Sequence, residues 1–297
     1  MIVVTGATGR TGRRVAERLL AEGEKVRAVG RNVERLAPLV ERGAEASLGN
    51  VEDANFLART FAGATAVYLV LPEDISQQDF RAHQERVSDA YAGAVAKTHV
   101  PYAVNLSSIG AQHEHGTGPI VGLHNQEQKL NQIDGLNVLH VRAAYFMENL
   151  FMNMVPLRVS GTLPGAMPGG VRMPWIATCD IGDYAAGCLV ARNFSGSSVQ
   201  ELHGQRDISM SEAALIVGEA IRRPDVHYEQ LPGPALAGML SEMGLPKKSV
   251  EALLEMWDGA NKGLIVPQEP RTAENTTATS LETFVKETFA PVYLHGG

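Results

Sequence analysis

Three glycines near the amino terminus form the strongest chemical signal in the chain. They lie in Thr5-Gly6-Ala7-Thr8-Gly9-Arg10-Thr11-Gly12, after an apolar run that predicts a buried strand and before a segment with helical periodicity. This context favours a dinucleotide-binding fingerprint over the alternative, a plain glycine turn. Such glycines permit the tight turn, the approach of a pyrophosphate and close helix packing, and the helix amino terminus then receives the phosphates. The predicted cofactor-binding residues of this loop are Gly6, Thr8, Gly9, Arg10, Thr11 and Gly12.

The residues after the second predicted strand indicate which dinucleotide binds. NAD-specific folds place Asp or Glu there to hold the ribose 2′-hydroxyl. This chain has Arg31 and Asn32 instead. A guanidinium binds a 2′-phosphate in bidentate fashion, and Arg10 could approach the same group. We therefore expect NADP(H) as the cofactor; the alternative for Arg31 is a solvated surface residue.

Further cofactor contacts are expected at the ends of other strands, because each strand's carboxyl end faces the nucleotide. Asn50 and Val51 follow the third strand and are expected near the adenine ring. Leu71-Pro72 and Ser107-Ser108 follow the next two strands and are expected to flank the nicotinamide ribose.

Apolar runs and helical segments alternate along the first half of the chain. This alternation predicts repeated βαβ units and an α/β fold with a doubly wound parallel sheet of the NAD(P)-binding Rossmann type. Strands are predicted at residues 1–5, 25–30, 64–71, 100–106, 135–142 and 199–202, and the main helices at 11–22, 34–42, 79–98, 123–133, 180–192 and 211–221.

The amino-acid composition of the chain changes near Pro156. Glycines and prolines crowd residues 156–174, which predicts a loop that leaves the sheet and walls a cleft. We predict a nucleotide-binding domain at 1–155, with its sheet completed by residues near 176–205. Residues 156–297 are expected to form a smaller α/β substrate lobe over the carboxyl ends of the strands.

Several segments together resemble the NmrA-like branch of the atypical short-chain dehydrogenases/reductases. They are the glycine loop, Arg31-Asn32 and Arg142-Ala143-Ala144-Tyr145-Phe146-Met147-Glu148-Asn149, with agreement at 180–186 and 201–204. The resemblance implies a nucleotide domain with a small carboxyl-terminal lobe and NADP(H) as the usual ligand. Some members of this branch are reductases of quinones or azo dyes, and others are redox sensors without turnover.

The helix at 123–133 departs from the ordinary short-chain dehydrogenase pattern. Those enzymes use Tyr-x-x-x-Lys, in which the phenol donates a proton. Here Asn125 stands four residues before Lys129. Lys129 is expected to hold the ribose and Asn125 to orient a carbonyl, because the two share one helix face; a solvated lysine is the alternative. His124 and Tyr145 complete the candidate catalytic set, with cleft wall or core as the alternative for Tyr145.

Composition and charge exclude other classes of protein. The 297 residues carry a net charge of −7 and 44% hydrophobic residues, which argues against disorder and against nucleic-acid binding by counterion release. No apolar run approaches a membrane span, and no metal site is expected, since His113-Glu114-His115 lies in a glycine-rich loop. The two cysteines are predicted to be buried thiols in a reducing cytoplasm. A homodimer is expected because two-fold homodimers are the commonest oligomers of soluble proteins.

These observations predict an NADPH-dependent reductase that transfers a hydride to a quinone-like or other electrophilic small molecule. Hydride addition to a quinone gives a stabilised anion, so it demands less of a protein acid, which suits the missing Tyr. The alternative is a non-catalytic sensor that binds NADP(H) and changes its contacts with a partner protein.

Overall fold

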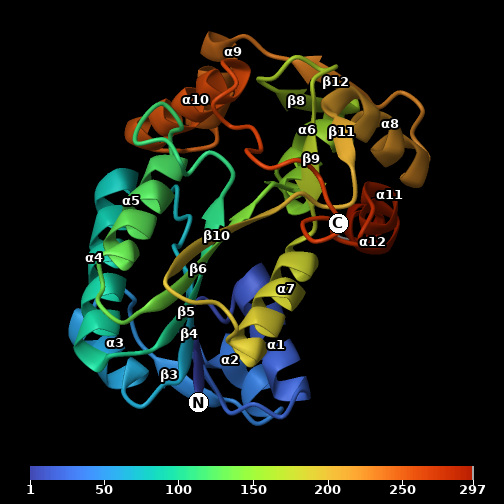
Figure 1. Ribbon diagram of the computed structural model, residues 1–297. Coiled ribbons are helices and arrows are strands. Elements are labelled where there is room, and N and C mark those ends of the chain that lie inside the picture. The colour runs from blue at the N-terminus through green and yellow to red at the C-terminus, as the bar shows by residue number, and fades with distance from the viewer. Residues whose placement is uncertain (296–297) are drawn as a thin grey trace.

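A seven-stranded parallel sheet forms the centre of the molecule (Figure 1). The structure is a computed structural model and describes residues 1–295. The strand order is β10-β6-β5-β4-β1-β2-β3, and every neighbouring pair is parallel. The strands are β1 (Ile2–Val4), β2 (Val26–Gly30), β3 (Glu45–Leu48), β4 (Ala66–Val70), β5 (Tyr102–Ser108), β6 (Asn137–Ala143) and β10 (Ser197–Leu202). The predicted α/β fold of the Rossmann type is confirmed.

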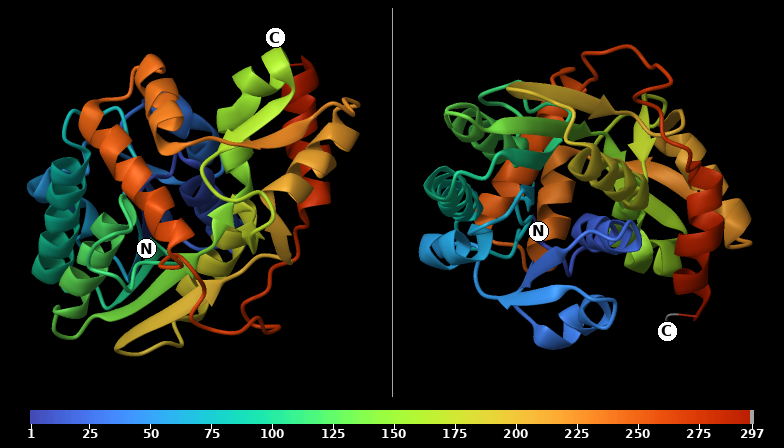
Figure 2. Two further views of the ribbon diagram at one scale, coloured as in Figure 1. Left: turned by 90° about the horizontal axis from the view of Figure 1, so that it is seen from above. Right: turned by 60° about the horizontal axis from the view of Figure 1, so that its bottom comes forward.

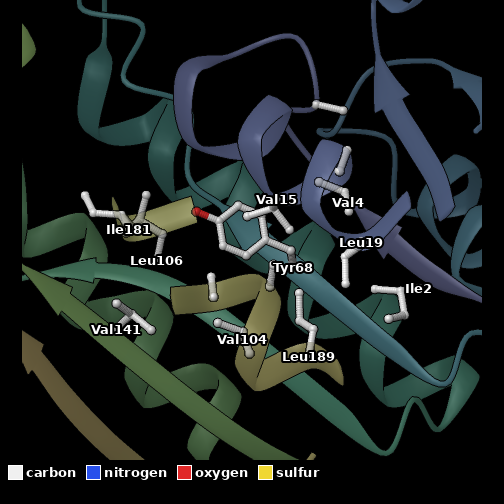
Figure 3. Close-up of a cluster of buried hydrophobic side chains, with 14 of the residues drawn as sticks. Ile2, Val4, Val15, Leu19, Tyr68, Val104, Leu106, Val141, Ile181 and Leu189 are labelled. Atoms are coloured by element: carbon white, nitrogen blue, oxygen red, sulfur yellow. The ribbon is translucent and has the colours of Figure 1, made fainter. Parts of the chain in front are cut away.

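Helices cover both faces of this sheet. Successive residues of a strand point to opposite faces, so Ile2 and Val4 join one apolar core while Val3 joins the other. The first core lies under α1 (Arg10–Ala21), α2 (Val33–Val40) and α7 (Thr178–Ala191). Figure 3 shows Tyr68 of β4 in this core, among side chains from α1 and α7. The second core lies under α3 (Ala54–Phe61), α4 (Phe80–Thr98) and α5 (Ile120–Asn131).

A smaller lobe stands above the carboxyl ends of the strands (Figure 1). Its own apolar core surrounds the fully buried Trp175, whose indole N–H donates to the carbonyl oxygen of Ile208 at 3.0 Å. The lobe contains a three-stranded and a two-stranded sheet and several short helices. Its elements are β7 (Tyr145–Phe146), η1 (Met147–Asn153), α6 (Met154–Ser160), β8 (Thr162–Gly165), β9 (Arg172–Ile176), β11 (Asp207–Ser209), α8 (Met210–Ala220), β12 (His227–Gln230), α11 (Leu281–Phe284), η2 (Val285–Phe289) and α12 (Ala290–His295).

Two further helices, α9 (Gly233–Glu242) and α10 (Lys247–Asn261), form a hairpin with a separate apolar cluster. Seen from above, this hairpin stands opposite α6 and α12 (Figure 2). The hairpin docks on the loop between β5 and α5. A Cβ on Gly259 would lie 2.2 Å from the carbonyl oxygen of Gly116, and the Gly116 N–H donates to Glu255 at 3.0 Å. Only glycine permits so close an approach of the two backbones.

Some expectations about the elements are wrong. The predicted loop at 156–174 contains most of α6, all of β8 and the start of β9. Strand β8 was missed because it ends in Pro-Gly, which is typical of a turn. Pro164 is tolerated there because, within residues 1–295, β8 pairs with β12 alone. Cys179 is exposed rather than buried, and Cys188 is half-buried. Strand β10 pairs with β6 and completes the sheet, as expected, whereas the domain boundary at residue 155 stays a prediction.

Candidate functional site

The glycine loop joins β1 to α1 in the geometry that its sequence predicts. Gly6 has a φ of +59°, and a Cβ there would lie 2.4 Å from Cγ1 of Val70. A Cβ on Gly12 would lie 2.4 Å from the carbonyl oxygen of Gly6. The Thr5 hydroxyl donates to the carbonyl of Tyr68 at 2.9 Å and accepts from the N–H of Val70 at 3.1 Å. The turn is therefore fixed against β4 at the centre of the sheet.

The amino terminus of α1 is open to an anion. Its N-cap residue is Gly9, no side chain caps it within residues 1–295, and its first turn holds no acidic residue. Gly9 and Arg10 are exposed, while Thr11 and Gly12 are buried beneath them. The helix dipole and the amino-terminal N–H groups favour a negative charge at this end. The loop therefore fits the phosphates of a dinucleotide.

Basic residues follow β2 beside this loop. Arg31 is exposed, whereas the side-chain oxygen Oδ1 of Asn32 caps α2 by accepting from the N–H of Arg35 at 2.9 Å. The Arg35 guanidinium donates to the carbonyl oxygen of Thr8 at 3.0 Å. Arg35 was not among the residues expected from the sequence; its position four residues after Arg31 was the available signal. The structure thus brings Arg35 against the glycine loop, places Arg31 directly after β2, which pairs with β1, and gives Asn32 a capping role.

The other expected cofactor contacts have local partners. The Asn50 side chain is exposed and accepts from the N–H of Glu52 at 3.1 Å, which closes a turn. Val51 packs against the second core, and Leu71 is buried in it. Pro72 is half-buried at the carboxyl end of β4. These residues lie after β3 and β4, as the sequence predicts, and their contact with a nucleotide stays a prediction.

The Ser107 side chain contacts a buried ion pair between Glu127 and Arg142. Its hydroxyl donates to the Glu127 carboxylate at 2.5 Å, and the Arg142 guanidinium donates to both oxygens of that carboxylate, at 3.0 and 2.6 Å. Glu127 is 1% exposed. A buried carboxylate needs such partners, because desolvation of an unpaired charge is costly. The pair therefore fixes Ser107 at the carboxyl end of β5, and Glu127 is a residue that the sequence reasoning missed.

A second polar network lies between β5, β6 and α5. Nδ1 of His140 lies 3.0 Å from the Asn105 amide nitrogen, and Nε2 lies 2.8 Å from the Asn131 side-chain oxygen. The Asn105 oxygen accepts from Gln126 at 2.5 Å, so the Asn105 nitrogen must donate to Nδ1. This pattern requires a neutral imidazole with its proton on Nε2. Burial lowers the pKa of His140 to about 4.

The structure places Lys129 against α4. Its ammonium donates to Glu85 at 2.5 Å and to Asp89 at 2.6 Å, and the Asn125 amide lies 3.4 Å from the Glu85 carboxylate. Burial lowers the pKa of Lys129, but the two carboxylates outweigh it and the net pKa is raised. Asn125 and Lys129 share a helix face, as expected. That face meets α4, on the side of the sheet opposite α1, and contact of Lys129 with the ribose stays a prediction.

His124 and Tyr145 lie in two further places. Nδ1 of His124 lies 2.9 Å from the carbonyl oxygen of Ala111, in the loop after β5. The Tyr145 ring packs edge-on against Trp175 with centroids 4.7 Å apart, beside the lobe core. Burial raises the pKa of Tyr145 to about 12. The four candidate catalytic residues therefore do not form one cluster.

Residues 1–295 contain neither a candidate metal cluster nor a helix that could span a membrane. No group of three or more His, Cys, Asp or Glu side chains is arranged to hold a metal ion in this part of the chain. Within the same residues, no helix has the length and apolar character needed to cross a membrane.

The fold and the glycine loop together define a Rossmann-type α/β protein with a dinucleotide-type fingerprint. The NmrA-like family profile matches residues 1–284. The chain belongs to the NmrA-like family.

Characterised relatives are similar over most of the chain. An NAD(P)H azoreductase from Xenophilus azovorans is 27% identical over 261 residues, which are 86% of this chain and 86% of the relative. Quinone oxidoreductase 2 of Escherichia coli is 24% identical over 271 residues, 89% of each chain. The structure of an Escherichia coli NADPH-dependent quinone oxidoreductase complexed with NADPH superposes with a TM-score of 0.81 at 21% identity, over 97% of this chain and 100% of that one.

Proposed function

We propose that the protein is an NADPH-dependent reductase that transfers a hydride to a quinone-like or other electrophilic small molecule. The observation that carries the proposal is the open amino terminus of α1 beside Arg31 and Arg35. A helix terminus accommodates the pyrophosphate, and a pair of guanidinium groups accommodates a 2′-phosphate. The activities of two relatives, an NAD(P)H azoreductase and a quinone oxidoreductase, support a reductase that uses NAD(P)H.

The residues of this chain bind and position the reactants. The cofactor, when bound, supplies the hydride. Gly9 and Gly12 admit the phosphates to the helix terminus, and Ser107, fixed by Glu127, borders the expected nicotinamide end of the sheet. The lobe above the strands holds the acceptor and restricts water. Most of the acceleration then comes from proximity and orientation.

A strong acid is not needed for this reaction. Hydride addition to a quinone forms a hydroquinone anion, which takes a proton from water after the transfer. No Tyr-x-x-x-Lys pair occupies α5, because Asn125 stands at the Tyr position and Lys129 is paired with α4. This arrangement favours quinone-like acceptors over simple ketones.

The first experiment is a fluorescence titration with NADPH and NADH, followed by addition of a simple quinone. We expect tighter binding of NADPH, and loss of nicotinamide fluorescence after the quinone is added. Binding without any loss for a panel of quinones would contradict the reductase and favour the sensor. No binding of either dinucleotide would refute the cofactor site itself.

The cofactor preference is tested with Arg31→Glu. The substitution replaces a phosphate contact by repulsion, so the Kd of NADPH should rise at least about tenfold more than that of NADH. Arg59→Glu is the control, because it makes the same change of charge at an exposed position on α3. An unchanged ratio of the two Kd values in Arg31→Glu would refute the role of Arg31.

The proposal also includes a cytoplasmic location, a homodimer and a division into a nucleotide domain at 1–155 and a lobe at 156–297. Cell fractionation tests the first and light scattering of the purified protein tests the second. Limited proteolysis tests the third, since cleavage should concentrate near residue 155 if the boundary lies there.

A further inference from the structure

The side chain of Arg10 leaves the glycine loop and contacts the lobe. Its guanidinium carbon lies 5.5 Å from the centre of the Phe151 ring, over the ring face. Arg10 is the first residue of α1, and Phe151 belongs to η1. A guanidinium at this distance is attracted by the negative face of the ring. The contact joins the phosphate-binding turn directly to the lobe.

Phe151 is held in place by two other aromatic rings. It packs edge-on against Phe284 with centroids 6.2 Å apart, and tilted against Phe289 at 5.3 Å. Phe284 is 4% exposed and Phe289 is fully buried in the lobe core. The ring that contacts Arg10 is therefore a fixed surface on the lobe, and it restricts the rotamers of an otherwise exposed side chain.

The charge of Arg10 has no carboxylate partner within residues 1–295. One turn further along α1, Arg14 makes two hydrogen bonds to Asp183, at 2.7 and 2.8 Å. Arg10 makes no such pair there, and the first turn of the helix carries no acid. A guanidinium held beside an open helix amino terminus adds a full positive charge to the partial charge of the helix dipole. Both attract an anion to the same place.

The direction of Arg10 separates it from the other arginines near the loop. Arg35 reaches the carbonyl of Thr8, and Arg31 follows β2, so these two lie on the side of the second strand. Arg10 is instead turned toward the lobe. This geometry favours a different role for Arg10 from the one expected from the sequence, which was to approach the 2′-phosphate with Arg31.

We propose that Phe151 positions the Arg10 guanidinium to bind the pyrophosphate of the dinucleotide, so that the lobe supplies part of the cofactor site. Phe151 is then a positioning residue and Arg10 a binding residue. This inference rests on the proposed binding of NADP(H) and assigns the two phosphate groups to different arginines: the pyrophosphate to Arg10, and the 2′-phosphate to Arg31 and Arg35.

The test measures the Kd of three ligands: NADPH, NADH and 2′-AMP, the last by displacement of NADPH. NADH has the pyrophosphate alone, 2′-AMP has the 2′-phosphate alone, and NADPH has both. Arg10→Met should weaken NADPH and NADH by the same factor, about tenfold, and leave 2′-AMP unchanged. Phe151→Leu should weaken the two dinucleotides about threefold. Arg31→Glu should weaken NADPH and 2′-AMP and spare NADH.

Three controls separate positioning from lobe packing. Phe151→Tyr keeps the ring face and should retain the wild-type Kd values. Phe284→Leu loosens one of the two rings that hold Phe151 but keeps the ring face beside Arg10, so it should weaken the dinucleotides less than Phe151→Leu does. In the Arg10→Met background, Phe151→Leu should have no further effect, because its effect acts through Arg10.

Three results would overturn this inference, and each has a different meaning. Equal weakening by Phe151→Leu and Phe284→Leu would refute positioning in favour of general packing. Weaker binding of 2′-AMP by Arg10→Met would assign Arg10 to the 2′-phosphate and overturn the inference while leaving the proposed function intact. Failure of the wild-type protein to bind NADPH would overturn the proposed function and this inference with it.

Discussion

Acidification should destabilise the protein through His140, and this effect can be isolated. The neutral ring is required because Nδ1 accepts from the Asn105 amide, so a proton on Nδ1 would oppose two donors. Burial lowers the pKa of His140 to about 4; Arg142 also lowers it, and Glu127 opposes the shift. In the unfolded chain a histidine titrates near about 6.5.

The direction in which pH changes the free energy of unfolding follows from the number of protons that each state binds. Between the two pKa values the unfolded chain binds a proton that the folded protein does not, so the free energy of unfolding falls as the pH falls through this window. Linkage with pKa values of about 6.5 and about 4 gives a loss of about 2 kcal/mol between pH 7 and pH 5. The full loss, about 3 kcal/mol, is reached below pH 4.

The assay is urea unfolding of wild type and His140→Gln at pH 7 and pH 5, followed by circular dichroism. The variant has no titrating ring, so its free energy of unfolding should fall by about 2 kcal/mol less than that of wild type over this interval. The carboxylates are common to both proteins and cancel in the difference. His115→Gln, at an exposed loop position, is the control and should behave as wild type. An equal loss in wild type and His140→Gln would refute a neutral buried His140.

Three other substitutions test the site. Gly12→Ala places a Cβ 2.4 Å from the carbonyl oxygen of Gly6, so it should abolish NADPH binding and lower the free energy of unfolding by about 1–3 kcal/mol. Fluorescence titration measures the binding and urea unfolding measures the stability. A wild-type affinity for NADPH would contradict this prediction. Glu127→Gln leaves the Arg142 charge without its partner and should cost about 3–5 kcal/mol by the same unfolding assay, whereas a loss below about 1 kcal/mol would show that the pair is solvated. Lys129→Met removes a partly exposed ion pair, so it should cost about 1 kcal/mol or less and leave the Kd of NADPH unchanged. A large rise of that Kd would contradict this expectation and support the cofactor role predicted from the sequence.

The central sheet was predictable because its signals are local. Short apolar runs that end at glycine or proline mark the strands, as at Gly6 and Pro72. The glycine loop was predictable for the same reason, since the turn, the helix start and the close packing all depend on residues within one short segment. The strand order and the presence of β10 follow from the general rules for parallel sheets.

The pairing of Lys129 with α4 was missed because α5 was oriented by a catalytic spacing and not by burial. Leu123 and Leu130, seven residues apart, both pack against the second core. Gln126 and Glu127 lie between them on the same helix face and are buried too. Lys129 belongs to the neighbouring face that meets α4. The apolar spacing alone would have indicated this direction.

The contacts of the lobe could not be predicted from one sequence. Arg10 and Phe151 are far apart along the chain and meet only because β6 carries the chain up into η1 above α1. The strands at 162–176 have few apolar residues in a row and pair with segments that come much later. Such pairing depends on tertiary context that local propensity does not contain.

The path of the chain between β6 and β10 limits how the upper part of the molecule can move. The chain rises from β6 into the lobe, descends as α7 along α1, completes the sheet as β10, and rises again into β11. Three separate crossings therefore tether the lobe to the sheet, and closure of each connecting loop restrains rotation of one part about the other. The α9–α10 hairpin has its own attachment through Gly116 and Gly259. The lobe and the hairpin are therefore anchored to the sheet domain independently, so that a change of shape in one need not disturb the other.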